Sequence, residues 1–388
     1  MDFSDEDELA PHIARAREWI DANVDPRWAE EQYTSGAHQS MELHARLARD
    51  GILGAGFPEA YGGTDVELDF FRALFRELVL ADIRMEAWLT TNMIVRTILH
   101  VGTEEQKQAY VGGAIRGEVL IALGYTEPDS GSDVAAAKTT ATRDGDTWVI
   151  EGQKMFTSLA EVCSHVIVLA RTNPDVPKHK GLTMFLVPTA SEGFDLQPIH
   201  TLGNHRSNTT YYSGVRVPDA ARLGAVDGGW SVIRTALVFE RGVGMPHVAL
   251  RAGAELAAWA RATSRPDGSR VIDDPLVAGR LGRMAIETEV SHLLARRLDW
   301  MASRGEMPGV EGSMSKLYKS EADQRHHRDA LHVLGAAGLL APGTPDAPLG
   351  GHLEFGFRSA VVGTIYGGAS EIMREMIAEG RLGLPRNR

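Results

Sequence analysis

The spacing of apolar positions divides the chain into a helical, a strand-rich and a second helical region. In the first region apolar residues recur three or four positions apart, as at Leu9, Ile13 and Ala16. Residues at this spacing share one face of a helix, so they predict amphipathic helices. After a glycine-rich loop the same spacing returns over residues 68–100 and 103–115.

The second region consists of short runs of β-branched and aromatic residues separated by turn-forming residues. The runs are 147–150, 166–169, 182–187 and 209–212. Asp144-Gly145-Asp146 is one of the turn sequences between them. Short strands at regular spacing with turns between them predict a small β-barrel or β-sandwich.

Helical spacing resumes in the third region. The predicted helices are 228–263, 274–304, 313–334 and a last one after Ala369. Gly335, Gly338 and the stretch 341–351, which is rich in proline and glycine, interrupt this region because these residues break helices.

The order of the three regions defines the predicted fold. Strands do not alternate with helices, so a doubly wound sheet is not expected and the chain is assigned to the α+β class. We predict an N-terminal helical domain over residues 1–118, a central β-domain over 119–226 and a C-terminal helical domain over 227–388.

Composition narrows the classes of protein to which the chain can belong. Its 388 residues are 43% hydrophobic and 24% charged, the balance of a soluble globular protein. We expect no membrane span, because no apolar stretch is long enough, and no secretory signal, because the first residues are acidic. The net charge of −12 repels phosphate backbones, so nucleic acid is not an expected partner. Cys163 is the only cysteine, which excludes an internal disulfide and suits a cytoplasmic protein.

Two segments at the start of the β-region carry groups that could bind a ligand. The segment Gly124–Asp133 is rich in hydroxyl and turn residues, which place several donors in a small space, although an ordinary interdomain turn has the same composition. In the segment Lys154–Ser158, Phe156 could stack on a flat ring while Thr157 and Ser158 bond its edge. The alternative is a strand that ends in a core phenylalanine.

Glu240 is a third candidate because it lies on the apolar side of its predicted helix, three residues after Leu237. A carboxylate in such a place must be hydrogen-bonded or neutral. Buried carboxylates have raised pKa values, which suit a general base that works near neutrality. The alternative interpretation is a structural ion pair with an arginine such as Arg241.

The fourth segment, Thr364–Ile372, places two glycines before a predicted helix that begins with Ser370 and Glu371. The free N–H groups of such a helix start bind anions or carbonyl groups, although a simple capped helix after a loop has the same sequence. No metal site is expected, because the histidines lack the spacing of metal ligands. No G-x-S-x-G sequence indicates a serine nucleophile.

Taken together and in order, these segments resemble the acyl-CoA dehydrogenase family of flavoproteins over nearly the whole chain. The matching sequences are Tyr125-Thr126-Glu127-Pro128 with Gly131-Ser132-Asp133, Gly152 to Ser158, Val215-Arg216-Val217-Pro218, Phe239-Glu240-Arg241, and Ile365 to Ile372. The resemblance implies an N-terminal helical domain, a central β-domain and a C-terminal four-helix bundle, usually in a homodimer or homotetramer. It also implies FAD between the last two domains, with the adenine end touching a neighbouring subunit.

The resemblance implies a set of cofactor-binding residues. They are Leu123, Tyr125, Thr126, Gly131, Ser132, Phe156, Thr157, Ser158, Gly335, Gly338, Ala369 and Glu371. By this resemblance Thr126 would bond the pyrimidine edge of the flavin and Phe156 would pack on the ring. Gly335, Gly338 and Glu371 would belong to the contacts on the adenosine side.

The implied reaction is the dehydrogenation of an acyl thioester, an acyl-CoA or an acyl carrier protein, to the 2,3-enoyl thioester. Glu240 would remove the α-proton while the β-hydride passes to flavin N5. Ser132, Arg241, Tyr366 and Gly367 would contact the substrate, with the Gly367 N–H at the thioester carbonyl. Electrons would leave to an electron-transfer flavoprotein or a similar acceptor.

The chain departs from the common family pattern at three places, one of which is His332 in place of a common glutamine before Gly335. Many members carry the catalytic glutamate directly after the tyrosine of the last motif, where this chain has Gly367. A minority branch, which includes isovaleryl-type enzymes, carries it where Glu240 stands, so Glu240 is the predicted base. The family's Arg-x-x-Phe-Gly sequence, which reaches a neighbour's FAD, is reduced to residues 264–268 without the aromatic.

Two other functions remain open on the same resemblance. A flavin monooxygenase or oxidase of this fold also lacks the C-terminal carboxylate. A non-catalytic partner subunit of a hetero-oligomeric dehydrogenase would account for the altered sequence at 264–268. A hetero-oligomer is therefore the alternative to the expected homo-oligomer.

Overall fold

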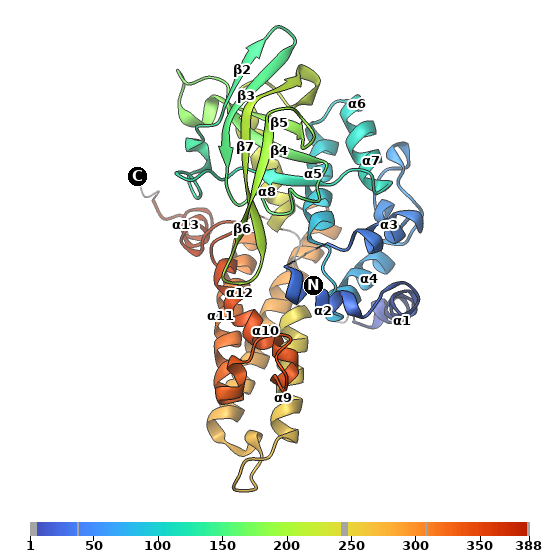
Figure 1. Cartoon of the computed structure of the whole chain (residues 1–388), viewed down its shortest axis with the longest axis vertical. Coiled ribbons are helices and arrows are strands. Elements are labelled where there is room, and N and C mark those ends of the chain that lie inside the picture. Colours follow the sequence, from blue (N-terminus) through green and yellow to red (C-terminus); the bar gives the residue numbers. More distant parts are fainter. Residues whose placement is uncertain (1–5, 37–38, 242–246, 307–308, 386–388) are drawn as a thin grey trace.

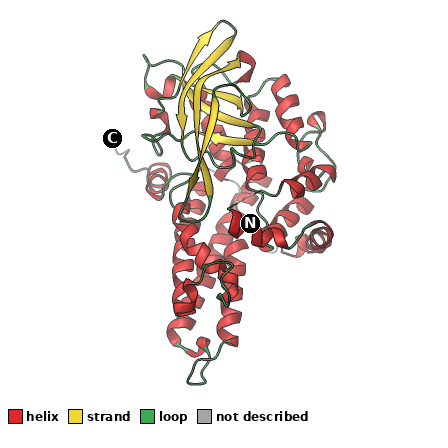
Figure 2. Cartoon of the chain, in the orientation of Figure 1, coloured by secondary structure: helices red, strands yellow, loops and turns green. Residues whose placement is uncertain are grey.

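The structure, a computed structural model, describes residues 6–36, 39–241, 247–306 and 309–385. The side chains of Glu240 and Arg241 are outside this description. Figure 1 shows a sheet with the N-terminal helices on one side and a long bundle of C-terminal helices below it. Figure 2 shows the strands gathered at the top of the molecule, apart from most of the helices. The order of the elements along the chain confirms the predicted order of helical, β and helical regions.

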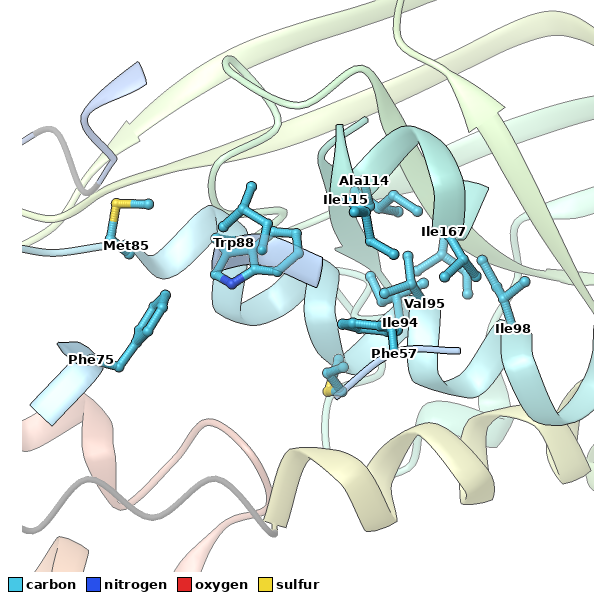
Figure 3. Packing of buried hydrophobic residues seen from close by; sticks show 14 of the residues in the cluster. Phe57, Phe75, Met85, Trp88, Ile94, Val95, Ile98, Ala114, Ile115 and Ile167 are labelled. Atoms are coloured by element: carbon cyan, nitrogen blue, oxygen red, sulfur yellow. The ribbon is translucent and has the colours of Figure 1, made fainter. Parts of the chain in front are cut away.

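Helices form the N-terminal region, as the apolar spacing predicts. They are α1 (Glu6–Asn23), α2 (Arg27–Ser35), α3 (Met41–Arg49), α4 (Leu68–Leu80), α5 (Glu86–Val101), α6 (Glu104–Gln106) and α7 (Gly112–Ile115). Their apolar faces share one core, in which Trp88, Ile94 and Ile98 of α5 are fully buried, with Ile94 and Ile98 near Ile167 (Figure 3). Because Ile167 belongs to a strand, this core joins the N-terminal helices to the sheet.

In the described part of the chain eight strands form one sheet, in the order β6-β7-β3-β2-β4-β5-β8, with β1 paired to β4. They are β1 (Ile121–Gly124), β2 (Thr140–Asp144), β3 (Thr147–Lys154), β4 (His165–Arg171), β5 (Leu182–Pro188), β6 (Phe194–His200), β7 (Arg206–Pro218) and β8 (Arg222–Leu223). The predicted runs are parts of β3, β4, β5 and β7. Of the other four, β2, β6 and β8 are short or largely exposed and lack the apolar run that would predict them. β1 is apolar and buried, but it is only four residues long.

Both faces of the sheet are buried around β4. Ile167 and Leu169 belong to the core shared with the N-terminal helices. Val166, Val168 and Ala170 belong to a second core on the opposite face. Successive strand residues point to opposite faces, so a continuous apolar run is what a strand between two cores requires.

The C-terminal helices pack around α11, which contacts each of the other five. They are α8 (Gly229–Arg241), α9 (His247–Ala262), α10 (Pro275–Ser303), α11 (Val310–Leu334), α12 (His352–Gly363) and α13 (Ser370–Gly380). The predicted helix over 228–263 corresponds to α8 and α9, and residues 242–246 between them are outside the described ranges. None of the helices within those ranges combines the length and apolar character that crossing a bilayer requires.

Helix α12 was not predicted, and Gly356 in its middle explains why. Glycine disfavours a helix, so it weakens the sequence signal. A Cβ built at Gly356 would lie 2.1 Å from the ring of His327 on α11. Packing of α12 against α11 therefore requires glycine at this position.

Candidate functional site

The first sequence-predicted segment forms a tight turn directly after β1. Glu127 N donates to Ser130 O at 2.9 Å, and Ser130 N donates to Glu127 O at 3.1 Å. Gly131 and Ser132 are exposed beyond this pair. A Cβ built at Gly131 would lie 4.0 Å from the nearest atom of Thr126, so space remains open on this side of the turn.

A buried ion pair holds this turn against the end of β3. Lys154 Nζ lies 2.7 Å from Glu127 Oε1, with the two side chains 0% and 5% exposed. Burial lowers the pKa of Lys154 to about 8, against the opposing effect of the Glu127 charge. Burial alone would raise the pKa of Glu127, but the charge of Lys154 and its hydrogen bonds outweigh that effect and lower it. A main-chain bond from Met155 N to Thr126 O, 2.8 Å long, reinforces the contact.

The second predicted segment, Phe156 to Ser158, begins with an unusual backbone conformation. Phe156 has a φ of +57°, in the left-handed region that non-glycine residues seldom occupy, and its side chain is 55% exposed. Such conformations cost free energy and persist only where surrounding contacts impose them. Here Ser158 N donates to Phe156 O at 2.9 Å. An aromatic ring is thereby presented to open space beside the turn.

Thr157 and Ser158 differ in their exposure and in their hydrogen bonds. Thr157 is fully buried, its hydroxyl lies 3.2 Å from that of Thr210, and both its main-chain groups bond Asn208 of β7. Its polar groups are therefore occupied in holding the segment to β7. Ser158 is exposed, and its hydroxyl lies 2.9 Å from that of Ser207.

The C-terminal candidates lie around the start of α13. Gly367 and Gly368 have φ values of +64° and +100°, and no side chain caps the helix at Ala369. Ser370 is 4% exposed, and among the described residues its buried hydroxyl has no hydrogen-bond partner. Tyr366, in contrast, is 64% exposed.

A cavity of about 520 Å³ opens beside this helix start, between α11, α12 and α13. Ala369, Ser370 and Glu371 contribute to its wall. Arg325, Arg328 and Arg374 also line it. Arg325 pairs with Glu287 at 3.0 Å and Arg374 pairs with Glu321, whereas Arg328 has no ion-pair partner within the described ranges. Free N–H groups and arginines together suit an anionic ligand.

The structure brings some predicted residues together and keeps others apart. Thr126 and the end of β3 are in direct contact, as predicted segments of one site would be. Gly335 lies at the far end of α11, whereas Lys316, 19 positions earlier on that helix, donates to Gly368 O beside α13. At 1.5 Å per residue the two ends are separated by about 28 Å. Gly335 and Glu371 of one chain therefore cannot contact the same small group.

Glu240 stands at the end of α8, a helix that contacts both α5 and β5. The preceding residue, Phe239, stacks on His100 of α5 with ring centroids 5.3 Å apart and planes 9° apart. The side chains of Glu240 and Arg241 are outside the described part of the chain, so their roles stay predictions.

Sequence reasoning did not single out Glu127 and Lys154 as a pair. The available signal was the alternation along β3, in which Lys154 has the same parity as the buried Trp148 and Ile150. A lysine at an inward position needs a partner, because an unpaired buried charge is costly. The sequence does not identify that partner, since Glu127 lies 27 positions away.

Family models match the chain in three consecutive parts. They are the acyl-CoA dehydrogenase N-terminal domain over residues 6–118, the middle domain over 122–216 and the C-terminal domain over 227–382. Acyl-CoA dehydrogenase FadE26 of Mycobacterium tuberculosis is 35% identical over 357 residues, which cover 89% of this chain and 88% of that protein.

Two solved structures match over the full length of both chains. One, titled Tcur3481-Tcur3483 steroid ACAD, is 35% identical with a TM-score of 0.91. The other, the ChsE4-ChsE5 complex from Mycobacterium tuberculosis, is 33% identical with a TM-score of 0.90. The matched models, the relative and the shared fold agree, and the chain belongs to the acyl-CoA dehydrogenase family of oxidoreductases.

Proposed function

We propose that the protein catalyses the FAD-dependent dehydrogenation of an acyl thioester to the 2,3-enoyl thioester. The observation that carries this proposal is the contact between the turn 124–133 and the end of β3. It sets Thr126 near an exposed Phe156 in a left-handed conformation. An aromatic face beside hydroxyl and main-chain donors suits the flat ring and polar edge of a flavin.

Residues in two separate parts of the chain, one in the β-domain and one among the C-terminal helices, fit FAD. On the β-domain side, open space lies beside Phe156 and Gly131. On the C-terminal side, the cavity of about 520 Å³ combines an uncapped helix start with arginines, a combination that binds phosphate groups. The buried hydroxyl of Ser370, which has no partner among the described residues, would gain one from such a ligand.

FAD, when bound, supplies the two-electron acceptor that takes the β-hydrogen of the substrate as hydride. Thr126 would hold the pyrimidine edge and Phe156 would pack on the ring. The Ser158 hydroxyl, already oriented by Ser207, would bond the ring near N5. Leu123, Tyr125, Gly131 and Ser132 would complete the flavin side, with Thr157 holding the segment in place.

Residues of the chain itself would accept the α-proton and bind the thioester carbonyl. Glu240 would accept the α-proton as the double bond forms. The Gly367 N–H would bind the thioester carbonyl oxygen, where negative charge develops. Ser132, Arg241 and Tyr366 would contact the substrate. The stacking of Phe239, the residue before Glu240, on His100 supports this assignment, because it holds the end of α8 against the N-terminal helix α5.

For the substrate we propose a coenzyme A thioester with a bulky, steroid-type acyl group. The support is the name of a steroid enzyme on a solved structure that is 35% identical over its whole length. Electrons would pass from the reduced cofactor to an electron-transfer flavoprotein or a similar acceptor.

We also propose that the protein acts in an oligomer. Gly335 and Gly338 lie about 28 Å along α11 from the start of α13, so they would contact the adenosine side of a cofactor held by another chain. Two full-length structural matches have titles that name pairs of proteins, which favours a hetero-oligomer over a homodimer or homotetramer.

The test is anaerobic reduction of the protein-bound flavin by a panel of acyl-CoA thioesters, including steroid-type ones. The wild type should lose its visible flavin absorption and release the 2,3-enoyl product. Glu240→Gln should keep the flavin but reduce it at least 100-fold more slowly, because a general base contributes about 10²–10⁴-fold. Glu289→Gln, at an exposed position of α10, is the matched control and should behave as wild type. Oxygen consumption without enoyl product would instead favour a monooxygenase or oxidase.

A further inference from the structure

The ion pair between Glu127 and Lys154 joins three segments of the β-domain. Glu127 lies in the turn after β1, and its carboxylate accepts the N–H of Lys138 at 2.6 Å and of Thr139 at 2.9 Å. Both of these residues precede β2. Lys154, at the end of β3, donates to Glu127 at 2.7 Å and to Tyr125 O at 3.3 Å. One carboxylate therefore receives three donors from two other segments.

Stability alone does not explain such a pair. Removing two charges from water has a cost that their mutual attraction often fails to exceed, and an apolar pair of similar volume is often as stable. What an ion pair with three directed hydrogen bonds adds is a defined relative position of the groups that it joins. Thr126 precedes Glu127, and Phe156 follows Lys154 by two residues. The pair thus sets the position of Thr126, which would bond the edge of the flavin, relative to Phe156, which would pack on its ring.

The close approach of the surrounding backbone supports a positional role. Gly152 of β3 has a φ of +140°, and a Cβ built there would lie 2.8 Å from Thr139 Cα. Thr139 Oγ1 also donates to Gln153 O at 3.1 Å. The segment before β2 that donates to the Glu127 carboxylate is therefore itself held against β3, so the turn is bonded to two elements that are fixed to each other.

We infer that Glu127 and Lys154 are positioning residues for the flavin: their ion pair sets Thr126 and Phe156 at the separation that the ring system requires. This inference rests on the proposed function, because it takes FAD as the ligand of the turn 124–133 and of the segment Phe156 to Ser158.

An exposed ion pair in the same place offers a matched control. Lys138 Nζ lies 2.8 Å from Asp129 Oδ2, so it joins the same turn to the same segment before β2, but the two side chains are 74% and 71% exposed. Exposed pairs are screened by solvent and fix position weakly. Lys138→Met removes this second link and keeps the main-chain N–H that bonds Glu127.

The test compares Lys154→Met, Glu127→Gln, the double variant and Lys138→Met. Equilibrium dialysis of the purified holoprotein against FAD gives the affinity, visible circular dichroism reports the flavin environment, and urea unfolding gives stability. Each single variant should bind FAD at least tenfold more weakly. The double variant leaves no charge unpaired, so it should regain most of the lost stability. Its FAD affinity should nevertheless stay at least tenfold weaker, with an altered dichroism spectrum, whereas Lys138→Met should match the wild type.

Separate outcomes distinguish the positioning role from the proposed function. A double variant that binds FAD as tightly as the wild type, with the same dichroism spectrum, overturns the positioning role alone. So does an equal loss of affinity in Lys138→Met. If the single variants do not fold, the double variant decides by the same criteria. A wild-type protein with no affinity for FAD overturns the proposed function, and the positioning role with it.

Discussion

On the β-domain side of the candidate site the polar groups are buried and bonded to one another, whereas the C-terminal side includes polar groups that have no partner among the described residues. Glu127, Lys154 and Thr157 are 5%, 0% and 0% exposed and satisfy one another or β7. At the start of α13 the helix is uncapped, and Ser370 has no partner among the described residues. One side is shaped before a ligand arrives, and the other supplies groups that a ligand would satisfy.

Because of this difference, substitutions on the two sides should affect stability and ligand affinity differently. A side whose groups hold one another in place loses stability and ligand affinity together when one group is removed. On a side whose groups have no partner until a ligand binds, removal of one group lowers ligand affinity and leaves stability nearly unchanged. Substitutions on the two sides should therefore separate these two quantities.

The largest effect on stability is expected on the β-domain side. Lys154→Met leaves the Glu127 carboxylate buried without its cation, which should lower the free energy of unfolding by about 3–5 kcal/mol. Urea unfolding at pH 7 measures the change. An unfolding free energy like that of the wild type would show that water reaches Glu127 and that this side is not preorganised.

A slightly smaller effect is expected behind the C-terminal side, where α12 packs on α11. Gly356→Ala should destabilise the protein by about 1–3 kcal/mol, because the new Cβ would meet the His327 ring at 2.1 Å. Gly363→Ala, on the same helix with its nearest neighbouring atom at 3.8 Å, should change thermal stability little. Equal melting temperatures for the two variants would mean that α12 does not pack as described.

The N-terminal domain provides a reference that belongs to neither side. Burial lowers the pKa of His44 from 6.5 to about 4, so the unfolded chain binds the proton more tightly than the folded one. The stability that this histidine contributes is fully present above pH 6.5 and is lost as the pH falls towards 4. At pH 5 the loss should be about 2 kcal/mol.

Urea unfolding of the wild type and His44→Leu at pH 7.5 and pH 5 measures this loss. The variant should be less sensitive to acid than the wild type. Identical pH dependence in the two proteins would contradict the burial of a neutral His44.

The smallest effect is expected for Ser370→Ala. Its hydroxyl has no partner to lose in the described structure, so the free energy of unfolding should stay within about 0.5 kcal/mol of the wild type. FAD affinity should fall about tenfold, because a hydrogen bond to a charged phosphate would be lost. A marked loss of stability with unchanged affinity would reverse the contrast between the two sides.

The sequence predicts the fold well where one physical signal dominates. Continuous apolar runs predict β4 and β5, and helical spacing predicts α10 and α11 to within a few residues. It misses α12, because the glycine that the packing on His327 requires is also a helix breaker. It misses β6 because that strand is mostly exposed and carries no apolar run.

For the candidate site, the segments could be predicted but their relations could not. The motifs place Thr126 and Phe156 in the site, yet no local pattern indicates that Glu127 and Lys154, 27 positions apart, form a buried pair. Likewise, the sequence does not show that the residues predicted for the adenosine side, Gly335, Gly338 and Glu371, lie in two different places. Only the length of α11 shows that Gly335 and Glu371 of one chain lie too far apart to share a ligand.

The most direct measurement is an anaerobic titration of the protein, purified from the cells that make it so that any partner chain stays bound. A steroid-type acyl-CoA thioester is added while flavin absorption and product are followed together. We expect bound FAD to be reduced with formation of one 2,3-enoyl thioester per flavin. Protein that holds FAD but is reduced by no acyl thioester, or protein that holds no flavin at all, would contradict the proposed dehydrogenation.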